Sequence, residues 1–183
     1  MSVLIAVHIP GKGSYVAADR RIISGADIMP DRGKFVQIEN KMIIGWVGPT
    51  HAMSAIKHNI AEVIEGADQD DIEHRAWVIG QNVAKLLGKS MHKYDDTGAF
   101  KYGGAMVIAF PTGVVNLSTD FTPGIAAPNQ LIATGSGGDI ALGAWSVLPE
   151  DMDPIERISR AAALPSRFIT SCDAQIDHAH LAC

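Results

Sequence analysis

Ser2, which follows Met1, places a hydroxyl group at the start of the chain. A serine hydroxyl is a poor nucleophile until a base takes its proton. The α-amine of a chain beginning at residue 2 could be that base, because its ordinary pKa of about 7.7–8.0 lies near neutrality. Removal of Met1 would expose this amine, and the small side chain of Ser2 suits that removal. The alternative is a serine without a chemical role, since serine is common at this position.

Three other features have residue types that could do chemistry. The turn 135–138, Gly-Ser-Gly-Gly, could cradle a phosphate, but it lacks the Gly-Lys-Ser/Thr ending of a P-loop. His178 and His180 share one face of an expected strand, and neither Cys nor Glu completes a metal site nearby. Cys172 has no basic neighbour in the sequence and is interpreted as a small buried hydrophobic residue. We therefore expect no metal and no organic cofactor.

Hydrophobic periodicity predicts the elements that position these residues. Pairs of apolar runs joined by short turns indicate antiparallel hairpins, and apolar residues repeating at i, i+3 and i+7 indicate helices. The expected elements are strands 3–8 and 14–18, strands 34–38 and 42–48, helices 53–64 and 70–87, a loop at 94–102, strands 104–110 and 114–118, helices 140–148 and 155–163, and a last strand at 174–181.

Blocks of strands followed by pairs of helices favour antiparallel sheets layered with helices over a doubly wound parallel sheet. Four helices covering two packed sheets would bury runs as apolar as these. The sequence therefore predicts an α+β fold, a four-layer αββα sandwich. Its length of 183 residues suits a single domain that spans residues 1–183.

Composition excludes several classes of protein. With 47% hydrophobic and 19% charged residues the chain is globular and not disordered. It has no run of about 18–20 apolar residues to cross a bilayer, and its N-terminus lacks the features of a signal peptide. A net charge of −5 without a Lys/Arg cluster argues against nucleic-acid and anionic membrane partners. Two cysteines make no disulfide framework, so we expect a cytoplasmic protein.

Five segments, in order and spacing, resemble those of one known family. They are Ala-Ala-Asp-Arg-Arg at 17–21, Gly-Lys-Phe-Val-Gln-Ile at 33–38, Ile-Gly-Trp-Val-Gly at 44–48, Asn-Leu-Ser-Thr-Asp-Phe at 116–121 and Ala-Thr-Gly-Ser-Gly-Gly-Asp-Ile-Ala-Leu-Gly-Ala at 133–144. With the hydroxyl residue after Met1, they make the chain similar, nearly end to end, to the proteasome β-subunit family, especially its HslV-like bacterial and phage members. The resemblance implies the fold of the N-terminal-nucleophile (Ntn) hydrolases.

The resemblance also implies a set of catalytic residues. Ser2 matches the nucleophile, and Asp19 and Lys34 match a carboxylate and an ammonium beside it. The cation would favour the deprotonated hydroxyl, and the carboxylate would hold the cation. Gly45 matches the residue whose N–H binds the oxyanion, and Ser136 matches the serine that hydrogen-bonds the terminal amine. Taken singly, Asp19 would be a solvated turn residue and Lys34 a charge at a strand edge.

Positions around the family's first specificity pocket correspond to Ile22, Arg32, Ile43 and Val47. Three of these four side chains are apolar, which favours a hydrophobic side chain in the substrate.

The chain departs from the family pattern near its end. Ile169 stands where the family commonly has an aspartate, and Cys172 stands where a small polar residue is expected. Three polar residues could compensate only after a shift in register: Thr170, Ser171 and Asp173. Pro165 should kink or end the last helix. Ser2 replaces the usual threonine, so the methyl group that helps fix the rotamer is absent and we expect slower turnover.

The resemblance implies a proteasome-type peptidase that cleaves peptides or unfolded proteins. It also implies a homo-oligomeric ring or spiral, with an ATPase unfoldase as a further partner. Two alternatives remain open. The first is a catalytically inactive structural subunit of such an assembly, and the second is an amidase that acts on small amides.

Overall fold

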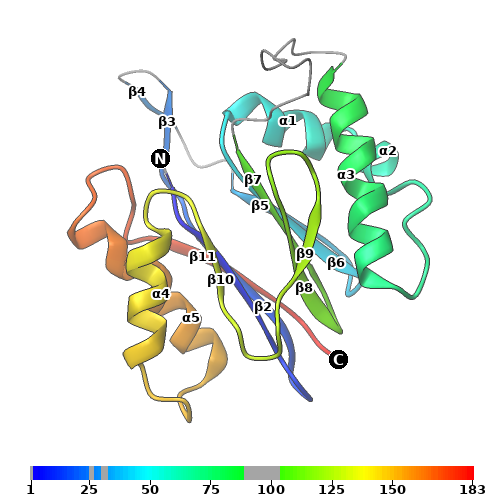
Figure 1. The fold of residues 1–183 in the computed structure, drawn as a ribbon. Helices are drawn as coiled ribbons and strands as arrows, with labels where there is room; N and C mark the ends of the chain where they lie inside the picture. The colour runs from blue at the N-terminus through cyan, green and yellow to red at the C-terminus, as the bar shows by residue number, and fades with distance from the viewer. Residues whose placement is uncertain (1, 25–26, 30–32, 89–103) are drawn as a thin grey trace.

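The computed structural model describes residues 2–24, 27–29, 33–88 and 104–183. Two antiparallel sheets lie face to face, with helices on both outer sides (Figure 1). The elements are β1 (Leu4–Ile9), β2 (Gly13–Asp19), β3 (Ile22–Ser24), β4 (Asp27–Met29), β5 (Phe35–Ile38), β6 (Met42–Val47), α1 (Thr50–His58), α2 (Ile60–Ile64), α3 (Ile72–Gly88), β7 (Ala105–Phe110), β8 (Gly113–Leu117), β9 (Pro123–Ile125), β10 (Ile132–Thr134), α4 (Gly138–Val147), α5 (Pro154–Ala163), a 3-10 turn η1 (Leu164–Arg167) and β11 (Ile176–Leu181). The α+β sandwich expected from the sequence is confirmed.

Hairpins determine the order of strands in each sheet. The first sheet has the order β10-β1-β2-β11, and the second has the order β5-β6-β7-β8-β9. Among the described residues, β3 and β4 pair with each other and with no other strand. The β1–β2 hairpin pairs Leu4 with Ala18, and β11 joins β2 so that Ile176 pairs with Asp19. The start of β1 therefore lies beside the end of β2 and the start of β11.

Three hydrophobic clusters hold the layers together. The first joins α1, α2 and α3 to the outer face of the second sheet, and includes Ile56, Ile79 and Phe110. The second joins α4 and α5 to the outer face of the first sheet. The third fills the space between the sheets with side chains such as Leu4 and Ile43, both fully buried. Figure 1 shows α4 and α5 on one side of the strands and α1, α2 and α3 on the other.

The expected helix at 53–64 is two helices. The break falls at Asn59, whose side-chain amide donates to the carbonyl of Ala55 at 2.8 Å while its backbone N–H donates to the same carbonyl. A side chain that hydrogen-bonds the last turn in this way competes with continuation of the helix. Pro165 ends α5 as expected, because the chain passes into η1 at Leu164. The expected loop at 94–102 lies outside the described residues.

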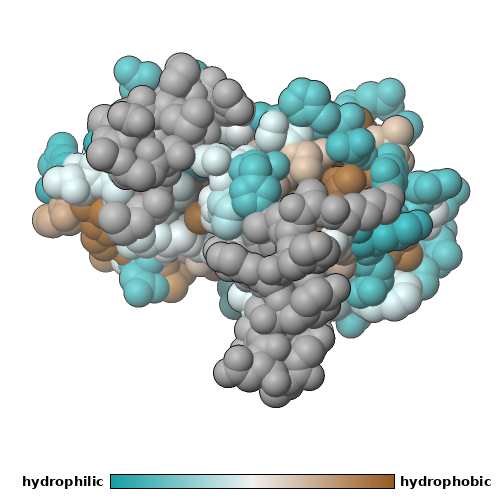
Figure 2. All heavy atoms as spheres, turned by 90° about the horizontal axis from the view of Figure 1, so that it is seen from above, coloured by the Kyte–Doolittle hydropathy of each residue, from teal (hydrophilic) through white to brown (hydrophobic). Residues whose placement is uncertain are grey.

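Hydrophobic side chains also reach the surface of α4. Leu142 is 47% exposed and Val147 is 81% exposed. Seen from above, hydrophobic residues gather at the left edge of the molecule, the side on which α4 lies (Figures 1 and 2). No helix among the described residues is long and apolar enough to cross a membrane.

The two sheets approach closely where β6 faces β1. A Cβ added at Gly45 would lie 2.9 Å from Cδ2 and 3.0 Å from Cδ1 of Leu4. Gly45 pairs with Phe35 on one side and Val107 on the other, so its backbone is inside the sheet. A glycine is therefore required at this position for packing.

We predict that Gly45→Ala lowers the free energy of unfolding by about 1–3 kcal/mol, because the added methyl group overpacks the space between the sheets. Chemical denaturation of the purified protein measures this loss. Adding Leu4→Ala vacates part of the same space, so the double variant should lose less than the sum of the two single losses.

Gly143 provides the matched control, because an added Cβ meets nothing within 4 Å on the exposed face of α4. Gly143→Ala should be neutral or stabilise by up to about 1 kcal/mol. Strict additivity of the Leu4 and Gly45 variants would contradict the proposed contact between the sheets.

Candidate active site

Backbone and side-chain hydrogen bonds hold Ser2 in place from two directions. The nitrogen of Ser2 donates to Oγ of Ser136 at 3.2 Å, and the N–H of Gly137 donates to the carbonyl of Ser2 at 3.2 Å. One residue further, the N–H of Val3 donates to Oδ1 of Asp19 at 2.7 Å, and the N–H of Asp19 donates back to the carbonyl of Val3 at 3.2 Å. The start of β1 is therefore fixed between the turn 135–138 and the end of β2.

Gly135 makes this close approach to Ser2 feasible. Its φ of +88° lies in the region that favours glycine, and an added Cβ would lie 2.2 Å from the carbonyl oxygen of Ser2. The turn thus uses its N–H groups internally and on Ser2: Gly137 donates to Ser2, and Gly138 donates to the carbonyl of Gly135. These contacts favour a role in holding residue 2 over the alternative of a phosphate cradle.

Asp19 and Lys34 form an ion pair in the interior beside Ser2. Their side chains are 0% and 5% exposed, and Nζ of Lys34 contacts Oδ1 of Asp19. Asp19 also accepts the N–H of Val3 on Oδ1 and the N–H of Asp173 on Oδ2, the latter at 3.2 Å. Two backbone donors and one cation thus satisfy the buried carboxylate, which a buried charge requires.

Burial lowers the pKa of Lys34 from its ordinary value of 10.5, and the negative charge and hydrogen bond of Asp19 oppose this change. A lowered pKa in the folded state means that the unfolded chain binds more protons between the two pKa values. The contribution of Lys34 to stability therefore rises with pH in that window.

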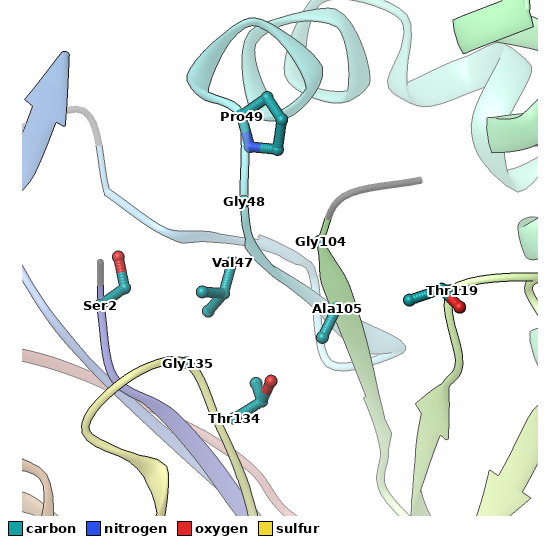
Figure 3. A pocket seen from close by; sticks show the side chains of 9 residues that line it. All are labelled: Ser2, Val47, Gly48, Pro49, Gly104, Ala105, Thr119, Thr134 and Gly135. Atoms are coloured by element: carbon teal, nitrogen blue, oxygen red, sulfur yellow. The ribbon is translucent and has the colours of Figure 1, made fainter. Parts of the chain in front are cut away.

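A cavity of about 470 Å³ opens beside Ser2. Its lining residues come from the ends of both sheets: Ser2, Val47, Gly48, Pro49, Gly104, Ala105, Thr119, Thr134 and Gly135. Figure 3 shows Ser2 on one side of the cavity and Thr119 on the other, with Val47 and Ala105 between them. None of the described residues that line it is charged.

The residues expected to form the specificity pocket have different positions. Val47 lines the cavity beside Ser2, whereas Ile43 is 0% exposed in the core between the sheets and is not among the residues that line it. Ile22 begins β3, where only the backbone is described, and Arg32 lies outside the described residues. Sequence reasoning missed Thr119, Thr134 and Ala105, because their approach to Ser2 arises only from sheet packing.

The region after η1 supplies contacts that the sequence left open. Of the three polar residues that could compensate for Ile169, Asp173 reaches the network, through its backbone N–H. Ser171 is buried at 2% exposure, and the carbonyl of Thr170 accepts a hydrogen bond from Arg21. Cys172 is also 2% exposed, and a Cβ added at Gly137 would lie 3.1 Å from its sulfur. The interpretation of Cys172 as buried is confirmed, and its close approach to Gly137 is the part that sequence reasoning missed.

The two histidines of β11 lie away from this network. Nε2 of His180 is 2.7 Å from the carbonyl oxygen of Lys12, and its ring stacks on Tyr15 with 4.3 Å between centroids. Within the described parts of the chain, no group of three or more His, Cys, Asp or Glu side chains is arranged to hold a metal ion.

No protein-family model and no curated protein sequence matches the chain. Solved structures do match it. BPH of Thiobacillus denitrificans superposes with a TM-score of 0.78 at 17% identity, over 98% of each chain. The same protein in complex with epoxomicin gives a TM-score of 0.77 at 16% identity, over 99% of this chain and 100% of that one. HslV from Trypanosoma brucei gives 0.71 at 14% identity, over 97% of each chain.

The chain has the fold of the proteasome-like Ntn hydrolases. The fold implied by the sequence resemblance is therefore confirmed. At 14–17% identity the likeness is one of fold, and the roles of Ser2, Asp19, Lys34, Gly45 and Ser136 stay predictions.

We predict that Asp19→Asn lowers the free energy of unfolding by about 3–5 kcal/mol at neutral pH, because it leaves the buried ammonium of Lys34 without its charge partner. The loss should shrink as pH rises towards 10.5, where Lys34 is neutral in the unfolded chain as well. Denaturant unfolding between neutral and alkaline pH measures both effects.

The pair between Lys41 and Glu39, at 3.0 Å, supplies the control, because its side chains are 67% and 74% exposed. Glu39→Gln should change stability by less than about 1 kcal/mol. An equal loss of stability in Asp19→Asn and Glu39→Gln would contradict the prediction that the buried ion pair of Asp19 and Lys34 stabilises the fold.

Proposed function

We propose that this chain is a proteasome-type peptidase whose nucleophile is Ser2, exposed as the N-terminal residue when Met1 is removed. The observation that carries this proposal is the arrangement around residue 2. Its nitrogen contacts Ser136 at 3.2 Å, and the buried pair of Asp19 and Lys34 adjoins it through Val3.

In the proposed reaction, Oγ of Ser2 attacks the carbonyl carbon of a peptide bond. The hydroxyl proton passes to the terminal amine of the same residue, which then delivers it to the departing amine of the substrate. Attack breaks the carbonyl π bond, collapse of the intermediate breaks the C–N bond, and an ester on Ser2 remains. Water then attacks the ester, returns a proton to Ser2 and releases the acid.

Each neighbouring residue has one part in this scheme. The charge of Lys34 favours the deprotonated hydroxyl and a neutral amine, and Asp19 holds that charge in place. Oγ of Ser136 accepts a hydrogen bond from the nitrogen of Ser2. This contact orients the lone pair of the Ser2 nitrogen towards the hydroxyl of Ser2. The resemblance predicts the N–H of Gly45 as the donor to the oxyanion, but Gly45 pairs with Val107 inside the second sheet and is not among the residues that line the cavity beside Ser2.

The cavity beside Ser2 supports a preference for uncharged substrate side chains. Val47, Ala105 and Thr119 give it apolar and hydroxyl walls, and its volume of about 470 Å³ accommodates a large side chain. We propose that a substrate residue next to the cleaved bond lies in this cavity.

The chain is also proposed to act as a subunit of a homo-oligomeric ring or spiral that encloses the sites, with peptides or unfolded proteins as substrates and an ATPase unfoldase as a further partner. The exposed hydrophobic residues Leu142, Val147 and Phe168 support a contact between subunits on the side of α4 and η1. A cytoplasmic location stays a prediction.

The first prediction concerns covalent labelling. A peptide epoxyketone needs both a terminal hydroxyl and its amine, so we expect intact mass spectrometry to find Met1 removed and one adduct per chain, mapped to Ser2. Ser2→Ala keeps a small residue at position 2, so Met1 should still be removed while the adduct disappears. Ser146→Ala, an exposed hydroxyl on α4, is the control and should label as the wild type does.

A protein that retains Met1 and takes no adduct would overturn the peptidase proposal and leave the structural-subunit alternative. Activity on a small amide, with none on peptides, would favour the amidase alternative.

The second prediction concerns the cavity. Thr119 is exposed at the far wall, so Thr119→Trp fills space without disturbing the core. We expect kcat/KM to fall about tenfold or more for peptides with a large side chain at the cleaved bond, and to stay unchanged for peptides with alanine there. Thr112→Trp, in the exposed β7–β8 turn, should affect neither. An equal fall for both peptides would place the substrate side chain elsewhere.

A further inference from the structure

The turn between β8 and β9 provides the far wall of the cavity beside Ser2. β8 ends at Leu117 and β9 begins at Pro123, so the turn consists of residues 118–122. Thr119 of this turn lines the cavity on the side opposite Ser2 (Figure 3). The position of the turn therefore determines how much room the cavity offers between Ser2 and Thr119.

Asp120 closes the turn with its side chain. Its Oδ1 accepts the hydroxyl proton of Ser118 and the N–H of Thr122, the latter at 3.0 Å. In the main chain, the N–H of Phe121 donates to the carbonyl of Ser118 at 2.9 Å, and the N–H of Ser118 donates to the carbonyl of Thr122 at 3.1 Å. The hydrogen bonds from Ser118 and Thr122 lower the pKa of Asp120 from 3.8 to about 2. The side chain is therefore a carboxylate, an acceptor for both donors, at neutral pH.

Phe121 anchors the turn to α3. Its side chain is 3% exposed in the cluster beneath α3, and its φ of +64° is uncommon for a bulky residue. Such a conformation persists only where the surrounding structure fixes it. A Cβ added at Gly80 of α3 would lie 3.0 Å from Cβ of Phe121 and 3.3 Å from its carbonyl oxygen. The helix thus approaches the backbone of the turn, and the missing side chain of Gly80 leaves room for this approach.

We propose that Gly80 and Asp120 are positioning residues that determine how large a substrate side chain the cavity beside Ser2 accepts. Gly80 allows Phe121 to lie against α3, and Asp120 keeps the turn 118–122 closed. Neither residue lines the cavity, so each acts through the position of the turn. This inference rests on the proposed function, since that function places a substrate side chain in the cavity.

The layers of the fold determine the direction in which a larger residue at position 80 moves the wall. α3 covers the outer face of the second sheet, and the cavity lies between the ends of the two sheets. An added methyl group meets Cβ and the carbonyl oxygen of Phe121, which belong to or adjoin the main chain and cannot rotate away. The turn must therefore move by a few tenths of an ångström away from α3 and towards Ser2 (Figures 1 and 3). This movement narrows the cavity.

The first experiment measures kcat/KM for peptides with a large side chain at the cleaved bond and for peptides with alanine there. In Gly80→Ala the value for the large side chain should fall about fivefold, and the value for alanine should stay unchanged, because only the large side chain needs the lost space. Asp120→Ala should also lower the preference for the large side chain, because the wall is no longer held against it. Asp120→Asn should restore the preference, since the amide oxygen can accept from the same two donors.

Gly88→Ala is the matched control for the glycine variant. Gly88 also belongs to α3, and a Cβ added there meets nothing within 4 Å among the described residues. This variant should match the wild type with both kinds of peptide. A fall of equal size for both kinds of peptide in Gly80→Ala would indicate a general loss of structure and would overturn the proposal.

The second experiment does not depend on catalysis. The turn contains Thr119 and Thr122, so the methyl resonances of these threonines in NMR spectra report a movement of the turn. Gly80→Ala should shift both resonances, and Gly88→Ala should shift neither. An unchanged resonance of Thr119 in Gly80→Ala would overturn the proposed link between α3 and the wall of the cavity.

The two experiments separate this inference from the proposed function. A wild type that neither cleaves peptides nor takes the epoxyketone refutes the peptidase and with it the role in specificity, while shifted methyl resonances still support the link between α3 and the wall. An active wild type whose preference for large side chains survives both Gly80→Ala and Asp120→Ala overturns the positioning role.

Discussion

The buried pair of Asp19 and Lys34 is the interaction on which the arrangement of the site depends. A carboxylate and an ammonium with 0% and 5% exposure are tolerated only because each has a partner and because two backbone N–H groups complete the carboxylate. Those donors belong to Val3 and Asp173, which lie 170 positions apart in the numbering and come from opposite ends of the chain. Satisfying one buried charge thus brings the first strand, the second strand and the last loop to a single point.

The same point is where the two sheets and the glycine turn meet. Ser2 precedes β1, Asp19 ends β2, and Lys34 precedes β5, so three strand ends contribute to one site. Gly135 then allows the turn before α4 to close over the backbone of Ser2, which no residue with a Cβ would permit. Residue 2 is held mainly through its backbone, and this leaves the hydroxyl side chain beside the cavity of about 470 Å³.

Much of this fold follows from local signals in the sequence. The β1–β2, β5–β6 and β7–β8 hairpins were predictable because each pairs two apolar runs across a short turn, and Pro165 marked the end of α5. The division of the expected helix at Asn59 was not predictable, because it depends on one side-chain hydrogen bond that hydrophobic periodicity does not reveal. Within the site, the resemblance brought Ser2, Asp19, Lys34 and Ser136 to attention. The structure joins Ser2 to Ser136, and joins Asp19 to Lys34 and to the backbone of Val3, the residue after Ser2. Ile43 is buried between the sheets instead of beside the cavity, because it lies on the same face of β6 as Val47 but further into the strand, away from its end at the cavity.

The loop after η1 contacts Asp19 although it lacks the aspartate expected at position 169. A backbone N–H needs no particular side chain, so the contact of Asp173 with Asp19 depends on the path of the loop and not on residue type. Position 172 is different, because its side chain packs against Gly137, and there a thiol stands where a small polar residue was expected. The sequence departs most from the family pattern at this loop, yet the loop retains a hydrogen bond to Asp19. Departure in residue type and preservation of donors and acceptors are therefore separate properties, and the second is the one that satisfies the buried carboxylate of Asp19.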